Sequence, residues 1–351
     1  MEQQRARIIV KRQRIVSFDA LKLFAIYLVI WGHCINWFQS GNGEENFMYR
    51  IIYSFHMPLF MMISGYFSYS SIKDSFSHFI KKKFRSLIYP CLVWGFILWI
   101  LLEPIHSFHY GSNVFSIWGL CVDFYWLSDF WFLKSCFICY CLLYLSVHSG
   151  LNKIIWIPLS ILISQGCTPF YISFMYPCFI IGWIIRDNEC YMRLLTKKCL
   201  VFIIIFCTML LFWNLNAWTK SHGIPNNLFE YNANDIIEII FFRFFRLFIG
   251  IIGSLSFISL FQLIFDNNKS KLHPQLIEIF SKWGRYTLET YIFQSILIER
   301  ILHRYIDVST LKPYWFIYTT IISIIILILC IYVTMLIQRS QFFSKTLWGK
   351  P

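Results

Sequence analysis

Charged residues are scarce in this sequence. Asp, Glu, Lys and Arg make up 14% of its 351 residues, whereas hydrophobic residues make up 58%. Ordinary soluble domains have about 25% charged and roughly 45–50% apolar residues, so this composition excludes a chain whose main solvent is water. Acidic residues are the scarcer kind, and the net charge is +13. Because the basic residues are confined to loops between apolar runs, they indicate membrane topology and no nucleic-acid partner.

An alternating pattern of apolar and polar residues persists nowhere in the apolar runs, which excludes β-strands. A cleavable signal peptide is also lacking. The first apolar run follows a basic leader, residues 1–16, and carries Asp19, Lys22 and His33 with no small-residue cleavage site after it. We therefore expect this run to be retained as a membrane span. The low content of Gly and Pro, together with heavy use of Ile, Phe, Lys and Asn, is typical of a bacterial source of low G+C content.

The 12 cysteines do not form a metal or redox motif. Most of them stand inside apolar runs, which indicates reduced thiols that pack in the core. Only Cys121 and Cys167 fall in segments that we expect outside the membrane, where a disulfide between them is the alternative. We expect no bound metal.

Ten apolar runs, most of them roughly 17 to 25 residues long, are candidates to cross a bilayer, although the fifth is short and the ninth is polar. They predict an all-α, polytopic bundle of about ten transmembrane helices that forms one domain over residues 1–351, with a short tail at 338–351 and no appended soluble domain. The eighth run is long enough to be tilted or to break near Gly250 and Gly253. The predicted spans are residues 17 to 38, 48 to 71, 86 to 104, 129 to 147, 152 to 165, 169 to 186, 199 to 217, 237 to 264, 285 to 302 and 314 to 337.

Lys and Arg are distributed unequally over the loops that join these runs. Most of them fall in the leader, the tail and alternate loops, while Lys220, Arg304 and Lys312 stand on the opposite side. By the positive-inside rule, both termini are cytoplasmic. The two longest external loops, near 105–128 and 218–236, are rich in aromatic, Asn and Gly residues. They are candidates either for a sugar-binding surface or for an ordinary lid over the bundle.

Ionisable side chains inside a span are costly, which makes each of them a candidate functional residue. Lys22 and His33 are 11 residues apart, so they share one helix face and lie about 16 Å apart along the axis. In the second run, His56 precedes Pro58, which removes a backbone donor and predicts a kink. We expect the two histidines to reach one level in the outer half of the bilayer. Either they act as acid–base groups or they are buried structural histidines bonded to nearby carbonyls.

Several segments resemble motifs of membrane-bound acyltransferase family 3, and most of all its fucose 4-O-acetylase-like members. The first two are FDALKLFAIYLVIWGH, which ends at His33, and SFHMPLFMMISGYF, which contains His56. Four later segments agree in order: KKKFRSLIYP, WFLKS, FIIGWIIRD and GRYTLETYIF. The resemblance covers nearly the whole chain. It departs from the family at Lys22, where Arg is usual, and at Gln294, where many members have His.

The resemblance implies transfer of an acetyl group from cytoplasmic acetyl-CoA, a co-substrate, to a hydroxyl of an exported, cell-surface or lipid-linked glycan such as an exopolysaccharide. It implies a multi-pass protein of the bacterial cytoplasmic membrane. His33 then corresponds to the essential family histidine and acts as general base, with an acetyl-histidine intermediate as the open alternative. His56 would assist or position it, and Lys22 would hold the pyrophosphate or thioester end of CoA.

Further residues are candidates for binding. A basic cluster after the second span suits the phosphates of CoA, although positive-inside topology alone also explains it; it comprises Lys81, Lys82, Lys83 and Arg85. Arg243 and Arg246 are candidates for the acceptor site or an oxyanion, or for pairing with Glu238, Glu289 or Glu299. Asp19 either orients Lys22 or forms a simple border ion pair, and Glu289 belongs to the last motif, with packing as its alternative.

Two other function classes remain open from the sequence. Intramembrane charges and an aromatic outer surface also suit a transporter or glycan flippase, although no internal repeat or pair of broken helices is evident. A non-catalytic subunit of a surface-glycan assembly system would explain Gln294, whereas the presence of both His33 and His56 favours an enzyme.

Overall fold

The structure is a computed structural model that describes residues 15–38, 43–110, 130–167, 169–222, 233–265, 273–307 and 314–350. Over these residues the chain is helical and has no strand, which confirms the all-α prediction. Most of the leader, Cys121 and much of both long loops lie outside the described residues. The longer helices are α2 (Val16–Phe38), α3 (Phe47–Ser68), α5 (Tyr89–Tyr110), α7 (Trp131–Val147), α8 (Lys153–Gln165), α9 (Ile172–Asp187), α11 (Cys199–Phe212), α13 (Ala233–Ile264) and α16 (Trp315–Ile337).

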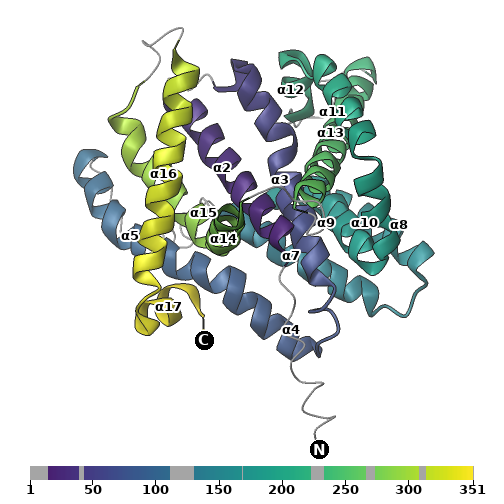
Figure 1. The fold of residues 1–351 in the computed structure, drawn as a ribbon, viewed down its shortest axis with the longest axis horizontal. Coiled ribbons are helices and arrows are strands. Elements are labelled where there is room, and N and C mark those ends of the chain that lie inside the picture. The colour runs from purple at the N-terminus through teal and green to yellow at the C-terminus, as the bar shows by residue number, and fades with distance from the viewer. Residues whose placement is uncertain are drawn as a thin grey trace, which may run out of the picture.

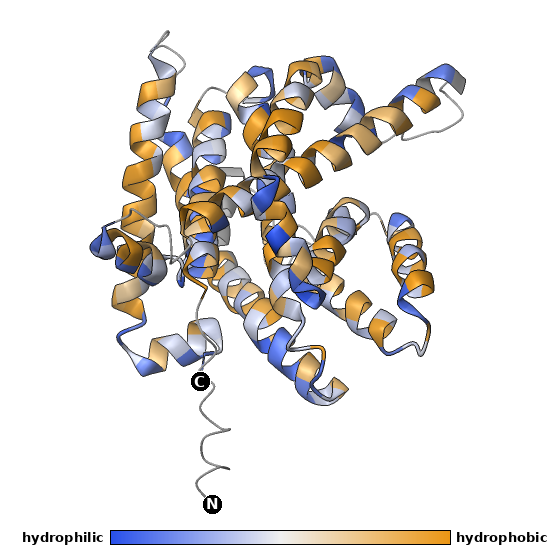
Figure 2. Cartoon of the chain, turned by 45° about the vertical axis from the view of Figure 1, so that its right-hand side comes forward, coloured by the Kyte–Doolittle hydropathy of each residue, from blue (hydrophilic) through white to orange (hydrophobic). Residues whose placement is uncertain are grey.

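Three of the described helices are long and apolar enough to cross a membrane: α2, α13 and α16. A fourth span would come from α10 (Glu189–Lys197) and α11 taken together, although these two helices are bent by 70° at their junction. Figure 2 colours much of the length of the described helices as hydrophobic. The chain is therefore a membrane protein by length and composition, while the full set of ten spans stays a prediction.

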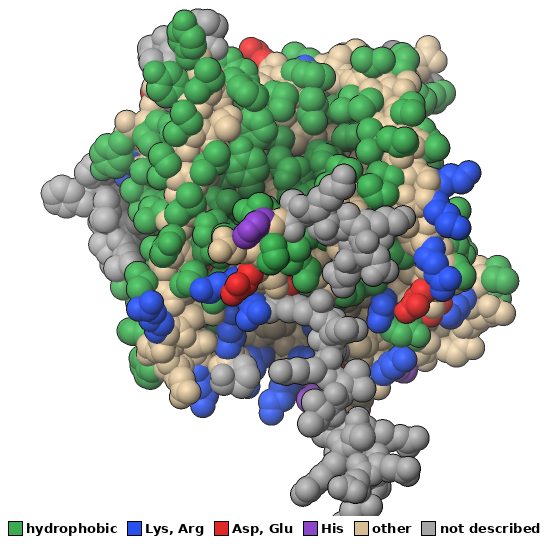
Figure 3. Space-filling model, viewed as in Figure 1, with side chains coloured by type: hydrophobic (Ala, Val, Ile, Leu, Met, Phe, Trp, Pro, Cys, Tyr) green, Lys and Arg blue, Asp and Glu red, His purple; other side chains and the backbone are tan. Residues whose placement is uncertain are grey.

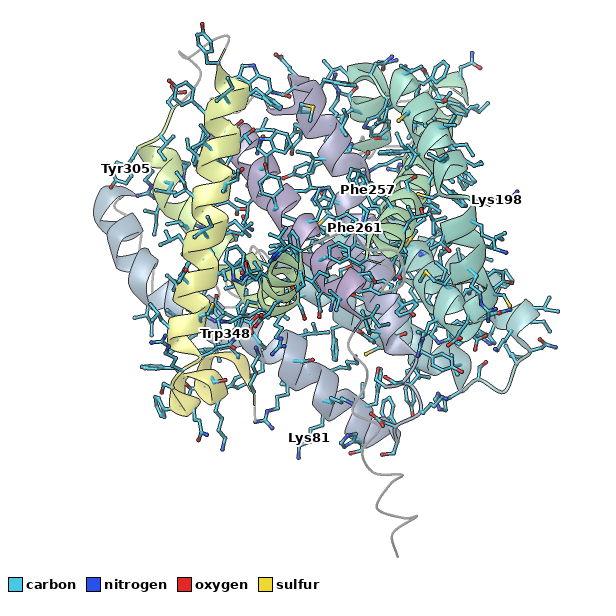
Figure 4. The ribbon with its side chains drawn as sticks, in the orientation of Figure 1. Lys81, Lys198, Phe257, Phe261, Tyr305 and Trp348 are labelled. Atoms are coloured by element: carbon cyan, nitrogen blue, oxygen red, sulfur yellow. The ribbon has the colours of Figure 1, made fainter. Side chains whose placement is uncertain are left out.

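The core of the molecule is built around α2 and α3, which lie between α16 on one side and α9 with α13 on the other (Figure 1). Phe257 of α13 stacks on Phe55 of α3 with ring centroids 4.6 Å apart, and it also contacts Phe24 of α2 at 5.1 Å. Phe261, one turn further along α13, contacts Phe24 as well (Figure 4). These aromatic contacts fix three helices around a common centre.

Glycines let helices in the core approach to backbone contact. Gly65 of α3 lies against the backbone of Phe179 in α9, and Gly182 of α9 lies against the backbone of Met62 in α3. The arrangement is reciprocal, so neither position has room for a Cβ atom. Small residues at such crossings are typical of helix packing in membranes, where close van der Waals contact replaces the hydrophobic effect.

Helix α13 runs without a break from Ala233 to Ile264, so the alternative of an interruption near its glycines is not observed. Gly250 instead packs on the ring of Pro58 and the carbonyl of Ser54, and Gly253 packs on Phe55. The glycines therefore bring α13 close to the proline-containing part of α3.

Lys and Arg side chains gather in the lower part of the face shown in Figure 3, and apolar side chains cover the upper part. Lys81, in α4 (Phe76–Lys83), points away from the molecule at this lower end (Figure 4). The tail returns to the same end as α17 (Gln341–Trp348), where buried Trp348 contacts Trp94 and Phe293. This separation of basic and apolar surfaces fits the orientation expected from the positive-inside rule.

Candidate active site

His33 stands near the end of α2 and is held by a carboxylate from the ninth predicted span. Its Nδ1 atom is 2.6 Å from Oε1 of Glu299. Glu299 belongs to a π-helical segment, η6 (Ile296–Ile301), which follows α15 (Thr287–Ser295). The carboxylate lies at ion-pair distance from Nδ1, and its charge favours a proton on that nitrogen, which leaves Nε2 as the nitrogen that can accept one. π-Helical turns recur at functional sites, where they re-aim side chains.

His56 lies on α3 and is 2% exposed. Its Nδ1 atom is 2.7 Å from the carbonyl oxygen of Ile52, one turn earlier in the same helix. Because a carbonyl only accepts hydrogen bonds, Nδ1 is the donor, and the neutral ring therefore presents Nε2 as an acceptor. The ring of Tyr53 packs edge-on against it at 4.6 Å. His56 thus combines a structural bond on one nitrogen with acid–base capacity on the other.

Both histidines line one cavity of about 320 Å³, which we call the histidine cavity. Helices α2, α3, α9, α13 and α15 contribute to its wall. Aromatic side chains form much of it, and the polar groups are few and converge, as is usual for ligand pockets. Its lining residues are Val29, His33, Glu44, Tyr49, Tyr53, His56, Met57, Trp131, Tyr171, Phe174, Met175, Trp218, His222, Arg246, Tyr291, Gln294, Ser295 and Glu299.

A second cavity, of about 160 Å³, adjoins the histidine cavity and contains Lys22. Val29, Met57 and Tyr291 line both spaces, so they form the boundary between them. Lys22 is 3.4 Å from the carboxylate of Asp19, and its ammonium lies 4.6 Å from the centre of the Phe67 ring. The structure therefore places a cation and a histidine along one route beside α2.

A third cavity, of about 800 Å³, opens at the basic end of the molecule. Lys81, Arg85 and Lys345 line it together with Ser77 and Tyr89. Lys345 comes from α17, which the hydroxyl of Tyr89 anchors by donating a hydrogen bond to the carbonyl of Thr346 at 2.9 Å. The cavity is therefore built from two segments that are far apart in the sequence.

The other two members of the predicted basic cluster point elsewhere. Lys82 pairs with Asp74 at 3.2 Å, and Lys83 lies over the ring of Tyr140 at 3.4 Å from its centre. The structure thus divides the predicted cluster and adds Lys345. Lys345 belongs to the tail that we expect in the cytoplasm, and nothing in the sequence of this tail indicates that it folds back onto the basic end of the molecule.

Arg246 lines the histidine cavity and also a fourth cavity, which it shares with Arg243. Its guanidinium lies 4.7 Å from the centre of the Phe174 ring, and its buried Nε atom has no hydrogen-bond partner. The carboxylates named as alternative partners are engaged by other groups. Glu238 pairs with Lys220 at 2.5 Å, Glu299 with His33, and Glu289 with Lys350.

Glu289 lies outside the four cavities. It is 1% exposed, and besides Lys350 it accepts a hydrogen bond of 2.7 Å from the side-chain amide of Gln338. The structure therefore brings together His33, His56, Lys22 and Arg246, while Glu289 ties the last motif to the tail.

Glu299 is the partner of His33 that sequence reasoning did not assign to it. The available signal was an acidic residue in an otherwise apolar run, which calls for a partner inside the bundle. Among the described residues, no group of three or more His, Cys, Asp or Glu side chains is arranged to hold a metal ion.

Residues 15–337 match the model of a family described as "Acyltransferase domain". Two curated relatives are similar to the chain, and both bear the name "Nodulation protein NolL". The protein from Mesorhizobium japonicum is 22% identical over 96% of this chain and 91% of its own length. The protein from Sinorhizobium fredii is 27% identical over 60% of each chain. No solved structure matches.

Proposed function

The chain belongs to the membrane-bound acyltransferase family 3, and from this premise we propose that it is an O-acetyltransferase of the bacterial cytoplasmic membrane. It moves an acetyl group from cytoplasmic acetyl-CoA to a hydroxyl of an exported or cell-surface glycan. The observation that carries the proposal is the histidine cavity, in which His33, oriented by Glu299, faces the same space as His56 and Arg246. Acyl transfer to a hydroxyl is promoted by a base that takes the hydroxyl proton and by a donor or cation that stabilises the oxyanion, and side chains of this cavity can supply both.

The cavities suggest how acetyl-CoA is held. The phosphates of CoA bind at Lys81, Arg85 and Lys345, in the large cavity of the basic end. The pantetheine arm extends past Lys22, through the smaller cavity, and brings the thioester to the boundary formed by Val29, Met57 and Tyr291. Most of the side chains that line the smaller cavity are apolar, which would keep water away from the thioester.

In the reaction, Nε2 of His33 takes the proton of the acceptor hydroxyl while the hydroxyl oxygen attacks the thioester carbonyl carbon. The negative charge of the tetrahedral intermediate is stabilised by Arg246. The carbon–sulfur bond then breaks, and the CoA thiolate receives the proton from His33. In a two-step variant, Nε2 attacks the thioester carbonyl and CoA leaves as the thiolate; the acceptor hydroxyl then attacks the acetyl carbon of acetyl-histidine, and the freed Nε2 takes the hydroxyl proton, which passes to the thiolate. His56 positions the acceptor hydroxyl in either route.

Purified protein in nanodiscs tests this proposal when it is supplied with acetyl-CoA labelled in the acetyl group. We expect saturable binding and slow release of labelled acetate in the absence of acceptor. If the protein neither binds nor consumes acetyl-CoA, the proposal fails, and a transporter or a non-catalytic subunit of a surface-glycan assembly system becomes the better explanation.

Replacing Glu299 with Gln is expected to lower kcat about 100-fold and leave the KM for acetyl-CoA within about twofold, because the carboxylate acts through the orientation and charge of His33. Steady-state kinetics with acetyl-CoA measure both constants. Glu299→Asp keeps the charge, so we expect it to recover part of kcat. Equal kcat losses in the two variants would indicate that Glu299 only supports packing.

Replacing both Lys81 and Arg85 with Gln is expected to raise the KM for acetyl-CoA roughly tenfold with kcat nearly unchanged, because charge-assisted bonds to phosphate are lost. Titration of acetyl-CoA in the nanodisc assay gives the two constants. Lys153→Gln is a matched control, since Lys153 is exposed and pairs with Asp187 away from this cavity. A KM equal to the wild-type value would place the phosphates elsewhere.

A further inference from the structure

The fourth cavity, of about 530 Å³, lies beside the histidine cavity, and we call it the arginine pocket. It is formed by the end of α8, the start of α9, α12 (Leu215–His222) and the middle of α13. Tyr171, Phe174, His222 and Arg246 line both spaces, so the arginine pocket and the histidine cavity adjoin each other. The complete lining is Gln165, Phe170, Tyr171, Ser173, Phe174, Ser221, His222, Ile240, Arg243, Phe244, Arg246 and Leu247.

The charged side chains among the described residues that line the arginine pocket are both cationic. Arg243 and Arg246 are one helical turn apart on α13, and none of the described residues that line the pocket is acidic. Burial and, to a smaller extent, the charge of Arg246 lower the pKa of His222, which lies outside the predicted spans, to about 3, so its ring stays neutral. Ser173 adds a neutral hydroxyl, whereas the hydroxyl of Ser221 already donates to the carbonyl of Trp218 at 2.8 Å. Such a donor set fits an anion with several oxygens.

Arg246 is the strongest indication of a ligand. The structure gives its buried Nε no hydrogen-bond partner, and the aromatic faces of Phe174 and Tyr171 cover its guanidinium. Burying a cation without a hydrogen-bonded anion costs desolvation free energy, and attraction to a phosphate offsets part of that cost.

The rim of the arginine pocket is apolar and exposed. Ile240 and Phe244 line the pocket and are 49% and 59% exposed, although α13 is one of the helices suited to cross the membrane. The same face of α13 continues with exposed Ile237, Phe241 and Phe248. Exposed apolar side chains beside a cationic pocket match a ligand with a charged head and a long hydrocarbon chain.

We infer that the arginine pocket binds the diphosphate of a polyprenyl-diphosphate-linked saccharide, which is the acetyl acceptor of the proposed function on which this inference rests. Two guanidiniums one turn apart match two linked phosphates, the polyprenyl chain lies along the apolar face of α13, and the saccharide enters the histidine cavity. The acceptor therefore arrives sideways from the bilayer, before the glycan is released from its lipid.

Native mass spectrometry of the full-length protein in nanodiscs tests this inference, with undecaprenyl diphosphate as the probe. We expect wild-type protein to retain undecaprenyl diphosphate at least about tenfold more than undecaprenol or phosphatidylglycerol. The double variant Arg243→Gln, Arg246→Gln should lose about tenfold of this binding, and Arg304→Gln, which removes an exposed cation elsewhere, should bind as wild type does. Excess inorganic pyrophosphate should not displace the lipid.

Equal retention of undecaprenol, or unchanged binding by the double variant, would overturn the inference. Equal retention of phosphatidylglycerol would identify a general site for anionic lipids, and full displacement by inorganic pyrophosphate would identify a site for a soluble diphosphate; either result also overturns the inference.

Acetyl-CoA binding by each variant checks that the variant is folded. If wild type retains the lipid but does not consume acetyl-CoA, the proposed function fails while the lipid site stands. If wild type consumes acetyl-CoA but does not retain the lipid, the proposed function stands while the lipid site fails.

Discussion

Replacing His33 with Gln is expected to lower the rate of acetyl-CoA consumption about 10³-fold, since general-base catalysis contributes typically 10²–10⁴-fold. Gln resembles His in size and polarity but cannot take a proton from a hydroxyl. Binding of acetyl-CoA should change little, because the proposed CoA-binding residues lie in the cavity at the basic end and in the smaller cavity that contains Lys22. Turnover and binding, measured on the same nanodisc preparation, separate the two effects.

The matched control is His78→Gln. The side chain of His78 is 67% exposed and lies 4.0 Å from Asp74, away from the histidine cavity, so we expect wild-type turnover. A His33→Gln protein that binds acetyl-CoA and consumes it as fast as wild type would remove His33 from the chemistry. In that case the pair of His33 and Glu299 would be a structural ion pair inside the bundle.

The second large effect is expected on folding, at the crossing of α3 and α9. Gly182→Ala places a methyl group against the backbone of Met62, and Gly65→Ala does the same against Phe179. Since backbone atoms cannot turn aside as a flexible side chain can, the helices must separate. We expect each change to destabilise the protein by roughly 3 kcal/mol, at the upper end of the usual cost of overpacking. The thermal transition of the detergent-solubilised protein measures this loss.

Gly166→Ala is the control for this pair, because Gly166 has a helical φ and only the carbonyl of Ile163 nearby, at 3.6 Å from the added carbon. We expect its thermal transition to stay close to that of wild type. If the thermal transition of Gly182→Ala has the same midpoint temperature as that of Gly166→Ala, the close crossing of α3 and α9 is not a determinant of stability.

Much of the fold follows from the sequence because the bilayer restricts a chain to few solutions. Apolar runs of sufficient length predict helices, since only helices satisfy every backbone group within one segment. The helix bounds differ at several runs: the seventh, residues 199 to 217, covers α11 and the start of α12, and the ninth divides into α15 and the π-helical segment η6. Hydropathy does not encode such divisions, nor does it encode the contact of Glu299 in η6 with His33 of α2.

Part of the candidate site was also accessible from the sequence. The spacing of Lys22 and His33 on one helix face follows from helix geometry, and Pro58 marks the environment of His56. The partner of His33 was not accessible, because ion pairs between distant segments depend on tertiary packing. The same holds for Lys345, which reaches the basic cavity only because α17 returns to that end of the molecule.

Transfer of the acetyl group from the basic cavity to the histidine cavity can be tested by a sided assay in proteoliposomes of uniform orientation, with labelled acetyl-CoA supplied to one face at a time. We expect wild-type protein to consume label only when acetyl-CoA meets the face that carries Lys81 and Arg85. His33→Gln protein should not consume it from either face. Equal consumption from both faces, or consumption that does not depend on His33, would contradict transfer from a basic cavity to the histidine cavity.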